Sequence, residues 1–218
     1  MKAEFGISMW GKLMDEIQEE FELHVEPATA RGWFVTLSEH YDQPWRRYHN
    51  KNHIASLLAC FEKYSKSTCS SPMGMQLAIW FHDAKIVLNQ KGNELCSALL
   101  FNHFGAEINL PTTLQKEVGG MILATDMETT PQTDDEMLIA DMDIAGIGGT
   151  WEEFMRNNRW IGEEFAICLS LSATDFSRQC VTFFERLKKR DYIYHTRVFR
   201  ERYENPARSN IARYLDAS

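Results

Sequence analysis

A histidine and an aspartate stand side by side at the end of an apolar stretch of the chain. His82 and Asp83 directly follow residues 78–81, Ala-Ile-Trp-Phe. Burying a carboxylate or an imidazole without a partner is unfavourable, so such a pair usually has something to bind, and a divalent metal ion is the simplest candidate. The alternative is a pair whose hydrogen bonds are all made inside the protein.

Two other segments carry residues of the same types. His49 and His53 are four residues apart, so on a helix they share one face. Asp141 and Asp143 lie in an apolar run over residues 138–145. Residues two positions apart in a helix point about 200° away from each other around its axis. These two carboxylates are therefore not expected to face one ion together. Imidazole nitrogens with carboxylate oxygens suit Mn, Fe, Co, Ni or Zn better than Ca, and leave positions for water and substrate.

The order of these motifs resembles the HD superfamily of metal-dependent phosphohydrolases, most closely its YHN-type branch of bacterial proteins. An isolated His-Asp pair occurs by chance, whereas several motifs in the same order are specific. The resemblance covers the chain from about residue 5 to residue 215. The stretches that carry it are 46–54 (Arg-Arg-Tyr-His-Asn-Lys-Asn-His-Ile), 80–83 (Trp-Phe-His-Asp), 93–98 (Asn-Glu-Leu-Cys-Ser-Ala), 141–143 (Asp-Met-Asp) with Gly146, and 204–211 (Glu-Asn-Pro-Ala-Arg-Ser-Asn-Ile).

The resemblance implies a metal centre with ligands from three motifs, namely His53, His82, Asp83 and Asp143. It places the ligand at the second aspartate of the Asp-Met-Asp motif, so Asp141 would either hydrogen-bond beside the ligands or be a hydrogen-bonding partner that faces a helix. The cofactor is expected to be one divalent ion, which could be Mn, Fe, Co, Ni, Zn or Mg. Two buried carboxylates at one site repel each other, so without the ion one of them should have a raised pKa. A buried polar network without metal is the alternative.

The implied activity is hydrolysis of a nucleotide or another small phosphorylated compound. A metal ion lowers the pKa of bound water, and a carboxylate such as Asp83 would accept the proton. Glu94 could orient a ligating histidine or relay a proton, although a glutamate at a helix start is also unremarkable. Lys85 could reach the mouth of the site and contact a phosphate there. The alternative is a lysine that faces solvent.

Phosphate binding requires positive charge, and the motif before His53 offers it. Arg47, His49 and Lys85 are the candidate substrate contacts, because phosphate favours bidentate arginine and other cationic donors. For His49 the alternatives are a residue that orients a ligand or one bonded to backbone at a helix entry. A solvated or salt-bridged arginine is the alternative for Arg47, and more so for Arg46.

The sequence departs from the branch pattern at two places. A histidine is expected near the end of the helix before the Asp-Met-Asp helix, but residues 125–128 contain none, and Met127 cannot replace it as an acid, base or hard-metal ligand. An expected arginine is replaced by Gly162. The alternative function is therefore a catalytically degenerate HD domain that senses a nucleotide or a metal. A helical scaffold without metal is a third option.

Composition limits the class of partner and the compartment. The chain of 218 residues has 23 basic and 31 acidic residues, a net charge of −8, which argues against a nucleic-acid polymer as partner. Its five cysteines form no Cys-x-x-Cys pair, as expected of reduced thiols in a cytoplasmic protein. The absence of a long apolar run predicts no membrane contact. The sequence leaves a homodimer open.

Helical periodicity and turn residues predict the elements that position these side chains. Alternating strand patterns are absent, so we predict one all-α, HD-type helical bundle over residues 1–218. The predicted helices cover residues 5–23, 28–41, 50–64, 75–87, 93–104, 111–124, a segment from 134 that carries Asp141 and Asp143, 151–168 with a capping box at Thr150 and Glu153, 173–190, and a short helix after Pro206.

Overall fold

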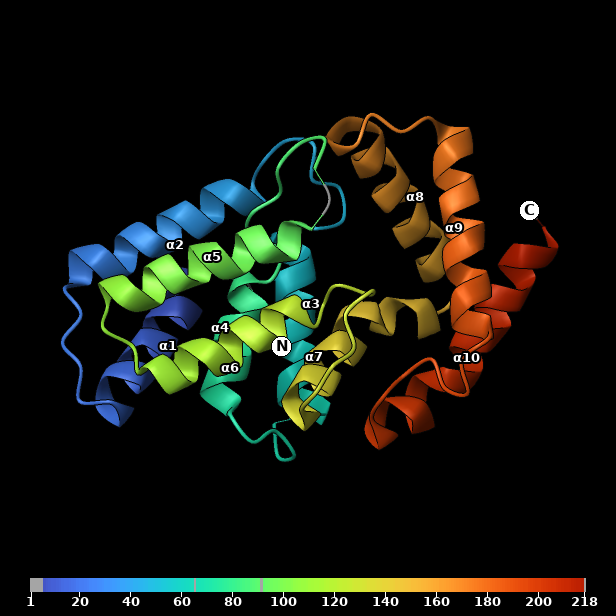
Figure 1. The fold of residues 1–218 in the computed structure, drawn as a ribbon. Helices are drawn as coiled ribbons and strands as arrows, with labels where there is room; N and C mark the ends of the chain where they lie inside the picture. Colours follow the sequence, from blue (N-terminus) through green and yellow to red (C-terminus); the bar gives the residue numbers. More distant parts are fainter. Residues whose placement is uncertain (1–5, 65, 91, 218) are drawn as a thin grey trace.

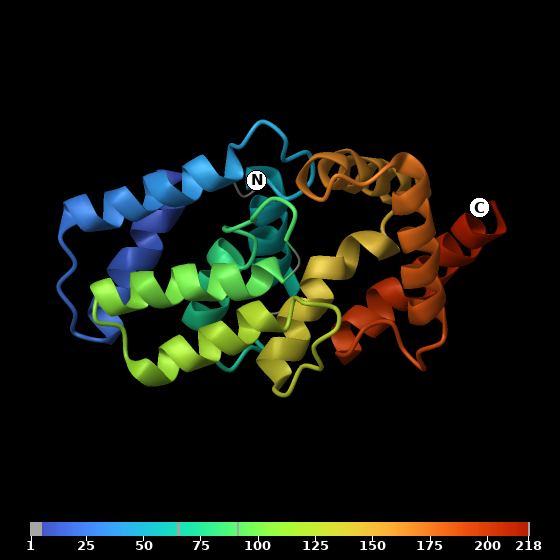
Figure 2. The same ribbon diagram turned by 45° about the horizontal axis from the view of Figure 1, so that its top comes forward.

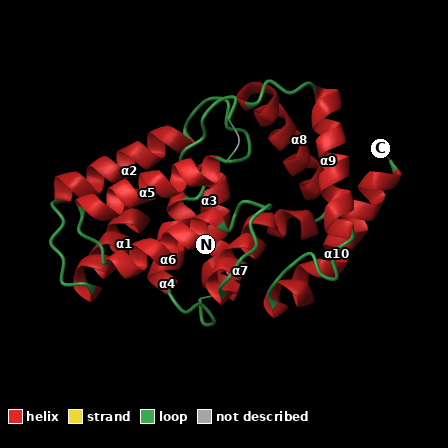
Figure 3. Ribbon diagram, in the orientation of Figure 1, coloured by secondary structure: helices red, strands yellow, loops and turns green. Residues whose placement is uncertain are grey.

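The computed structural model describes residues 6–64, 66–90 and 92–217. Within these ranges every regular element is a helix, so the all-α prediction is confirmed (Figure 3). None of these helices is both long enough and apolar enough to cross a membrane. The elements are α1 (Ile7–Glu20), α2 (Pro27–Tyr41), α3 (Lys51–Tyr64), α4 (Pro72–Phe81), α5 (Asn93–Glu107), α6 (Thr112–Leu123), α7 (Asp134–Asp143), the 3-10 helix η1 (Ile144–Gly148), α8 (Trp151–Cys168), α9 (Ala173–Lys188) and α10 (Arg197–Asp216).

The helices form two groups joined at the middle of the molecule. The first group, α1, α2, α4, α5 and α6, lies at one end, and α8, α9 and α10 lie at the other (Figure 1 and Figure 2). Between them stand α3 and α7, which carry His53 and Asp143. One hydrophobic core runs through both groups, from Trp10 in α1 to Ile211 in α10. The candidate ligands therefore lie where the two groups meet.

The apolar run before His82 forms the deeply buried end of helix α4. Every residue from 77 to 81 is at most 1% exposed. Trp80 packs edge-on against Trp10, with ring centroids 5.3 Å apart. Phe81 packs against Phe104 at 5.1 Å. Because aromatic side chains contribute much of the energy of a core, this packing fixes the end of α4 and the His-Asp pair that follows it.

The prediction for the helix carrying the His-Asp pair was wrong at both ends. The observed helix, α4, begins at Pro72 and ends at Phe81. Residues 82–87 therefore form a turn and a loop instead of two more helical turns. Side chains at the start of α5 hold this loop. The Val87 N–H donates to Asn93 Oδ1 at 2.8 Å, and the Lys85 N–H donates to Ser97 Oγ at 3.1 Å.

The last helix is also longer than predicted. It runs over Arg197–Asp216 with Pro206 in its interior, whereas the sequence predicted a start after that proline. Proline removes one helical hydrogen bond and crowds the carbonyl four residues earlier, that of Arg202. Arg202 and Pro206 are both exposed, so water can reach the Arg202 carbonyl. Glu204 and Asn210, on other faces of the helix, are buried.

The closing motif of the resemblance holds η1 in place. The amide nitrogen of the Asn210 side chain donates to the carbonyls of Ile147 and Gly149, each at 2.9 Å. The buried Glu204 carboxylate accepts the Ile193 N–H at 3.0 Å. These contacts fix the segment that directly follows Asp143, the last residue of α7.

Gly148 marks the closest approach of η1 to α10 and gives a first testable prediction. A Cβ at this position would lie 2.7 Å from Tyr203 Cβ and 2.8 Å from the Tyr203 carbonyl oxygen. We expect Gly148→Ala to lower the free energy of unfolding by about 1–3 kcal/mol, because overpacking displaces backbone. In the control Gly119→Ala the added Cβ meets nothing within 4 Å, and removing a helical glycine should stabilise by about 0.5–1 kcal/mol. Urea unfolding measures both, and equal midpoints would contradict this close approach.

Candidate metal centre

Four side chains from three helix ends converge at the junction of the two helix groups. His53 comes from α3, His82 and Asp83 follow α4, and Asp143 ends α7. One nitrogen or oxygen atom from each residue lies within 4.8 Å of the others, and the group could hold a metal ion. The structure thus brings together the four residues that the sequence singled out as ligands.

The distances between these atoms fit the spacing of ligands around one ion. His53 Nε2 lies 3.0 Å from Asp143 Oδ1, and His82 Nε2 lies 3.0 Å from Asp83 Oδ2. The two Nε2 atoms are 3.3 Å apart, and the two remaining nitrogen–oxygen distances are 3.6 Å. Ligands about 2.1 Å from one ion lie about 3.0 Å apart at a right angle and about 3.4 Å apart at a tetrahedral angle.

The hydrogen bonds of the cluster leave an acceptor without a donor. The buried Oδ2 atom of Asp83 lies 3.0 Å from His82 Nε2, in a contact that does not have hydrogen-bond geometry. His82 Nδ1 lies 3.0 Å from the Ile79 carbonyl, which can only accept, so Nδ1 carries a proton. Once Nε2 has given up its proton, its lone pair faces the cluster, as in metal-binding histidines. A cation would satisfy both the carboxylate oxygen and this nitrogen.

The electrostatics of the cluster also favour a cation. Burial lowers the pKa of His82, but the carboxylates of Asp83 and Asp143 outweigh it and hold this pKa well above its usual range. Burial raises the pKa of each aspartate, yet the neighbouring histidines bring both below their usual range. The expectation of a raised aspartate pKa was wrong, because it ignored the histidines between the carboxylates.

The cluster opens to solvent on its carboxylate side. The side chains of His53 and His82 are 4% and 0% exposed, whereas those of Asp83 and Asp143 are 19% and 21% exposed. The histidines therefore lie at the base, and the aspartates border the opening. A catalytic metal site needs such an open side for water and substrate, whereas a structural site is closed by protein ligands.

Arg46 ties the motif before α3 to the turn that carries Asp83. Its guanidinium donates to the carbonyls of His49 at 2.9 Å, Asp83 at 2.7 Å and Ala84 at 3.1 Å. It is only 5% exposed. The sequence interpretation considered Arg46 only as a weak phosphate candidate, and the structure instead makes it an organiser of the backbone around the cluster.

Glu164 is the residue of the site that sequence reasoning missed. It is fully buried, and its Oε2 atom accepts the backbone N–H groups of Arg47, Tyr48 and His49 at 3.1, 2.8 and 3.2 Å. Its Oε1 atom lies 3.0 Å from His49 Nδ1. The branch pattern has a glutamate two residues after the expected arginine, so its retention two residues after Gly162 was the available signal.

His49 lies beside the cluster. Its ring centroid is 5.7 Å from that of His53. Burial lowers the pKa of His49, but the carboxylates of Asp83 and Glu164 more than offset this and raise it to about 9. The imidazole is therefore charged at neutral pH. Arg47 is exposed, and its described hydrogen bonds are made by its backbone, whose N–H donates to Glu164 and whose carbonyl accepts from Asn50.

Known protein families do not add to this description. No protein-family model matches the sequence. No curated protein matches it either. The resemblance to HD-type phosphohydrolases therefore rests on the sequence motifs alone.

Glu94 lies within electrostatic reach of the cluster. Burial raises its pKa, and the carboxylates of Asp83, Asp126 and Asp143 raise it further. A carboxyl group with a raised pKa exchanges protons closer to neutral pH, as a general acid or base must. Its raised pKa is therefore consistent with the predicted role of Glu94 in proton transfer.

The Lys85 charge acts on His40 in α2. Burial lowers the pKa of His40 in α2, and the charge of Lys85 is the next largest cause. The Lys85 ammonium makes no ion pair with the cluster carboxylates in the described part of the chain. The structure therefore gives no contact that supports its predicted roles in catalysis and phosphate binding.

Asp141 points away from the cluster. Its two oxygens accept the backbone N–H groups of His195 and Thr196, each at 2.7 Å, and the Thr196 hydroxyl at 2.6 Å. Of the two roles expected for Asp141, these contacts agree with a hydrogen-bonding partner of another helix and give no hydrogen bond to the candidate ligands in the described structure. The fully buried Asp141 instead fastens α7 to the start of α10.

The two departures from the branch pattern have structural counterparts. A Cβ at Gly162 would lie 2.7 Å from a ring carbon of Phe176, so this ring fills the space where the side chain of an arginine would begin. Met127 is half-buried and packs against the hydrophobic core. Neither position supplies a charge or a ligand to the cluster.

Proposed function

We propose that this protein is an HD-type, metal-dependent phosphohydrolase that acts on a nucleotide or another small phosphorylated compound. The observation that carries the proposal is the cluster of two histidines and two aspartates, whose ligand atoms lie within 4.8 Å of one another and whose carboxylates are partly exposed. The charged His49 beside this cluster favours an anionic substrate.

Different residues of the site would bind the metal, bind the phosphate and transfer the proton. His53, His82, Asp83 and Asp143 would hold one divalent ion, which supplies Lewis-acid activation of water and neutralises phosphate charge. His49, held by Glu164, would bind a phosphate oxygen. Glu94 would accept a proton from the attacking water or donate one to the leaving group.

The test measures metal content and phosphatase activity of the untagged full chain. A panel of nucleotides and small phosphate esters is assayed with Mn, Fe, Co, Ni, Zn or Mg. Loss of a residue that merely orients a ligand costs about 10–100-fold, so we expect His82→Ala to reduce activity by at least about 100-fold. The exposed His24 lies outside the cluster and serves as the control in His24→Ala.

Three outcomes separate the alternatives. Metal-dependent turnover that His82→Ala abolishes supports the phosphohydrolase. Metal or nucleotide binding without turnover on the whole panel would favour the sensor. A chain that retains no metal and hydrolyses nothing would contradict both the metal centre and the proposed function.

A further inference from the structure

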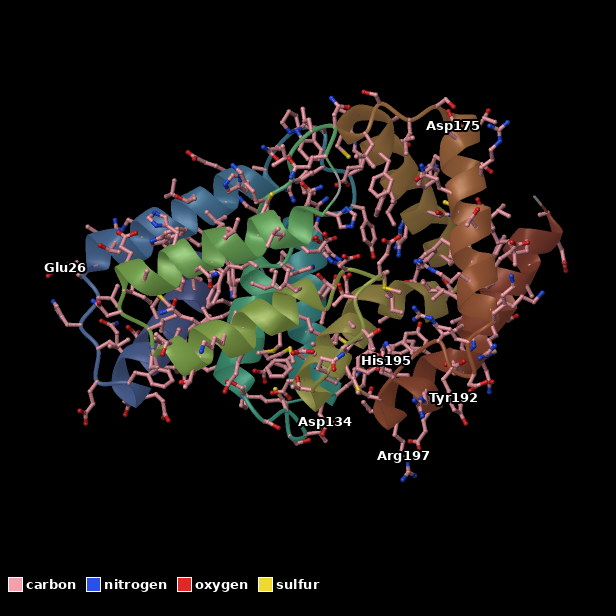
Figure 4. All side chains as sticks on the ribbon, in the orientation of Figure 1. Glu26, Asp134, Asp175, Tyr192, His195 and Arg197 are labelled. Atoms are coloured by element: carbon pink, nitrogen blue, oxygen red, sulfur yellow. The ribbon has the colours of Figure 1, made fainter. Side chains whose placement is uncertain are left out.

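A cavity whose lining includes none of the four cluster residues lies between the loop after α6 and the segment before α10. Its volume is about 260 Å³, and we name it the α7–α10 pocket. Ala140 of α7 forms part of its wall, and His195 lies between α7 and α10 in Figure 4. The residues that decide its chemistry are Asp126, Glu128, Thr130, Arg190 and His195.

The two acidic residues of this pocket already have partners. Asp126 Oδ1 accepts the Glu128 N–H at 3.1 Å, and Asp126 Oδ2 accepts the Thr129 hydroxyl at 3.4 Å. Glu128 Oε1 lies 3.8 Å from an Arg186 nitrogen, and the Glu128 side chain is 82% exposed. Water and Arg186 therefore screen the Glu128 charge, whereas Asp126 keeps its charge and has both oxygens occupied by neutral donors.

The basic residues of the pocket lack such partners. The half-buried Arg190 guanidinium makes no hydrogen bond or ion pair within the described ranges, and neither does the His195 ring. Their backbones are nevertheless fixed, because the Arg190 carbonyl accepts from Arg208 at 3.0 Å and the His195 N–H donates to Asp141 at 2.7 Å. Burial lowers the pKa of Arg190, and the like charge of Arg186 lowers it further.

We infer that the α7–α10 pocket binds the phosphate group of a small ligand at a site separate from the metal centre. The Arg190 guanidinium offers a bidentate fork, His195 a ring N–H and Thr130 a hydroxyl. Donors of these three kinds match the several oxygens of a phosphate better than the two of a carboxylate. Ligand pockets usually measure about 300–1,000 Å³, so a smaller cavity suits inorganic phosphate or a compact phosphate ester better than a nucleotide.

Isothermal titration of the full chain with inorganic phosphate tests this pocket, with the metal present in the wild type and absent from Asp143→Asn. Asp143→Asn removes a ligand of the metal centre and should leave phosphate binding at the pocket unchanged. Arg190→Ala should weaken that binding by about 10-fold or more, since it removes charge-assisted hydrogen bonds. Arg190→Lys keeps the charge without the fork and should fall between. Arg178 lies on α9, is 76% exposed and pairs with Asp175, so Arg178→Ala is the matched control.

The comparison of the variants is decisive whichever way it falls. Phosphate binding that survives in Asp143→Asn and weakens in Arg190→Ala supports the pocket. Binding that Asp143→Asn abolishes and Arg190→Ala preserves would place all the phosphate at the metal centre and overturn the inference. Absence of binding to the wild-type chain would overturn it as well. Glycerol phosphate and a nucleoside monophosphate, titrated in parallel, distinguish a compact ester from a nucleotide.

Discussion

Asparagine at position 143 is expected to abolish metal retention, whereas asparagine at position 141 is expected to preserve it. Asp143 Oδ1 lies 3.0 Å from His53 Nε2 and 3.6 Å from His82 Nε2. Asp141 contacts only the segment before α10 in the described structure, through the N–H groups of His195 and Thr196. Asp141→Asn should therefore lower the thermal midpoint, because an amide offers one acceptor oxygen where two are in use.

Metal content by mass spectrometry and thermal midpoints with and without chelator measure both variants. The pKa of Asp143 is lowered in the folded protein, so its charge contributes stability that is present above the ordinary pKa of 3.8 and is lost as the pH falls below it. Metal-free Asp143→Asn should thus be less stable than the metal-free wild type at neutral pH. If Asp141→Asn lost the ion and Asp143→Asn kept it, the assignment within this pair would be reversed.

The ligands could be predicted from the sequence because each lies in an unusual local context. His82 and Asp83 interrupt an apolar run, and Asp143 lies in another, so the cost of burying them is visible from neighbouring residues alone. That His53 joins them depended on the resemblance. Helical periodicity was equally local, which explains why the fold class and most of the helices could be predicted.

The contacts of the supporting residues could not be predicted, because most of their partners are backbone groups. Glu164 and Arg46 bind N–H and carbonyl groups, which occur at every residue and leave no mark on the sequence. Asp141 had the same apolar surroundings as Asp143, and only the distant segment at His195 distinguishes the two. Pro206 was read as a helix start because the buried faces on either side of it depend on tertiary packing.

Truncation of Glu164 is expected to have the largest effect on stability among the acidic residues of α8. Glu164→Ala would leave three buried backbone N–H groups and the charged His49 without their acceptor. Removing one partner of a buried ion pair costs about 3–5 kcal/mol, because the other is left uncompensated. The neighbouring Glu163 is 50% exposed and lies 3.7 Å from Arg159, so Glu163→Ala should cost no more than about 0.5 kcal/mol.

Urea unfolding of both alanine variants and of Glu164→Gln, measured between pH 4 and pH 9, completes this test. The pKa of Glu164 is lowered on folding, so its contribution is present above the ordinary value of 4.5 and is lost as the pH falls further. The pKa of His49 is raised to about 9, so its contribution is full below 6.5 and is lost as the pH rises toward 9. The stability difference between wild type and Glu164→Gln should therefore be greatest near pH 5–6 and shrink on either side. A difference that does not vary with pH would contradict a charged Glu164–His49 pair, and equal losses in Glu163→Ala and Glu164→Ala would contradict its burial.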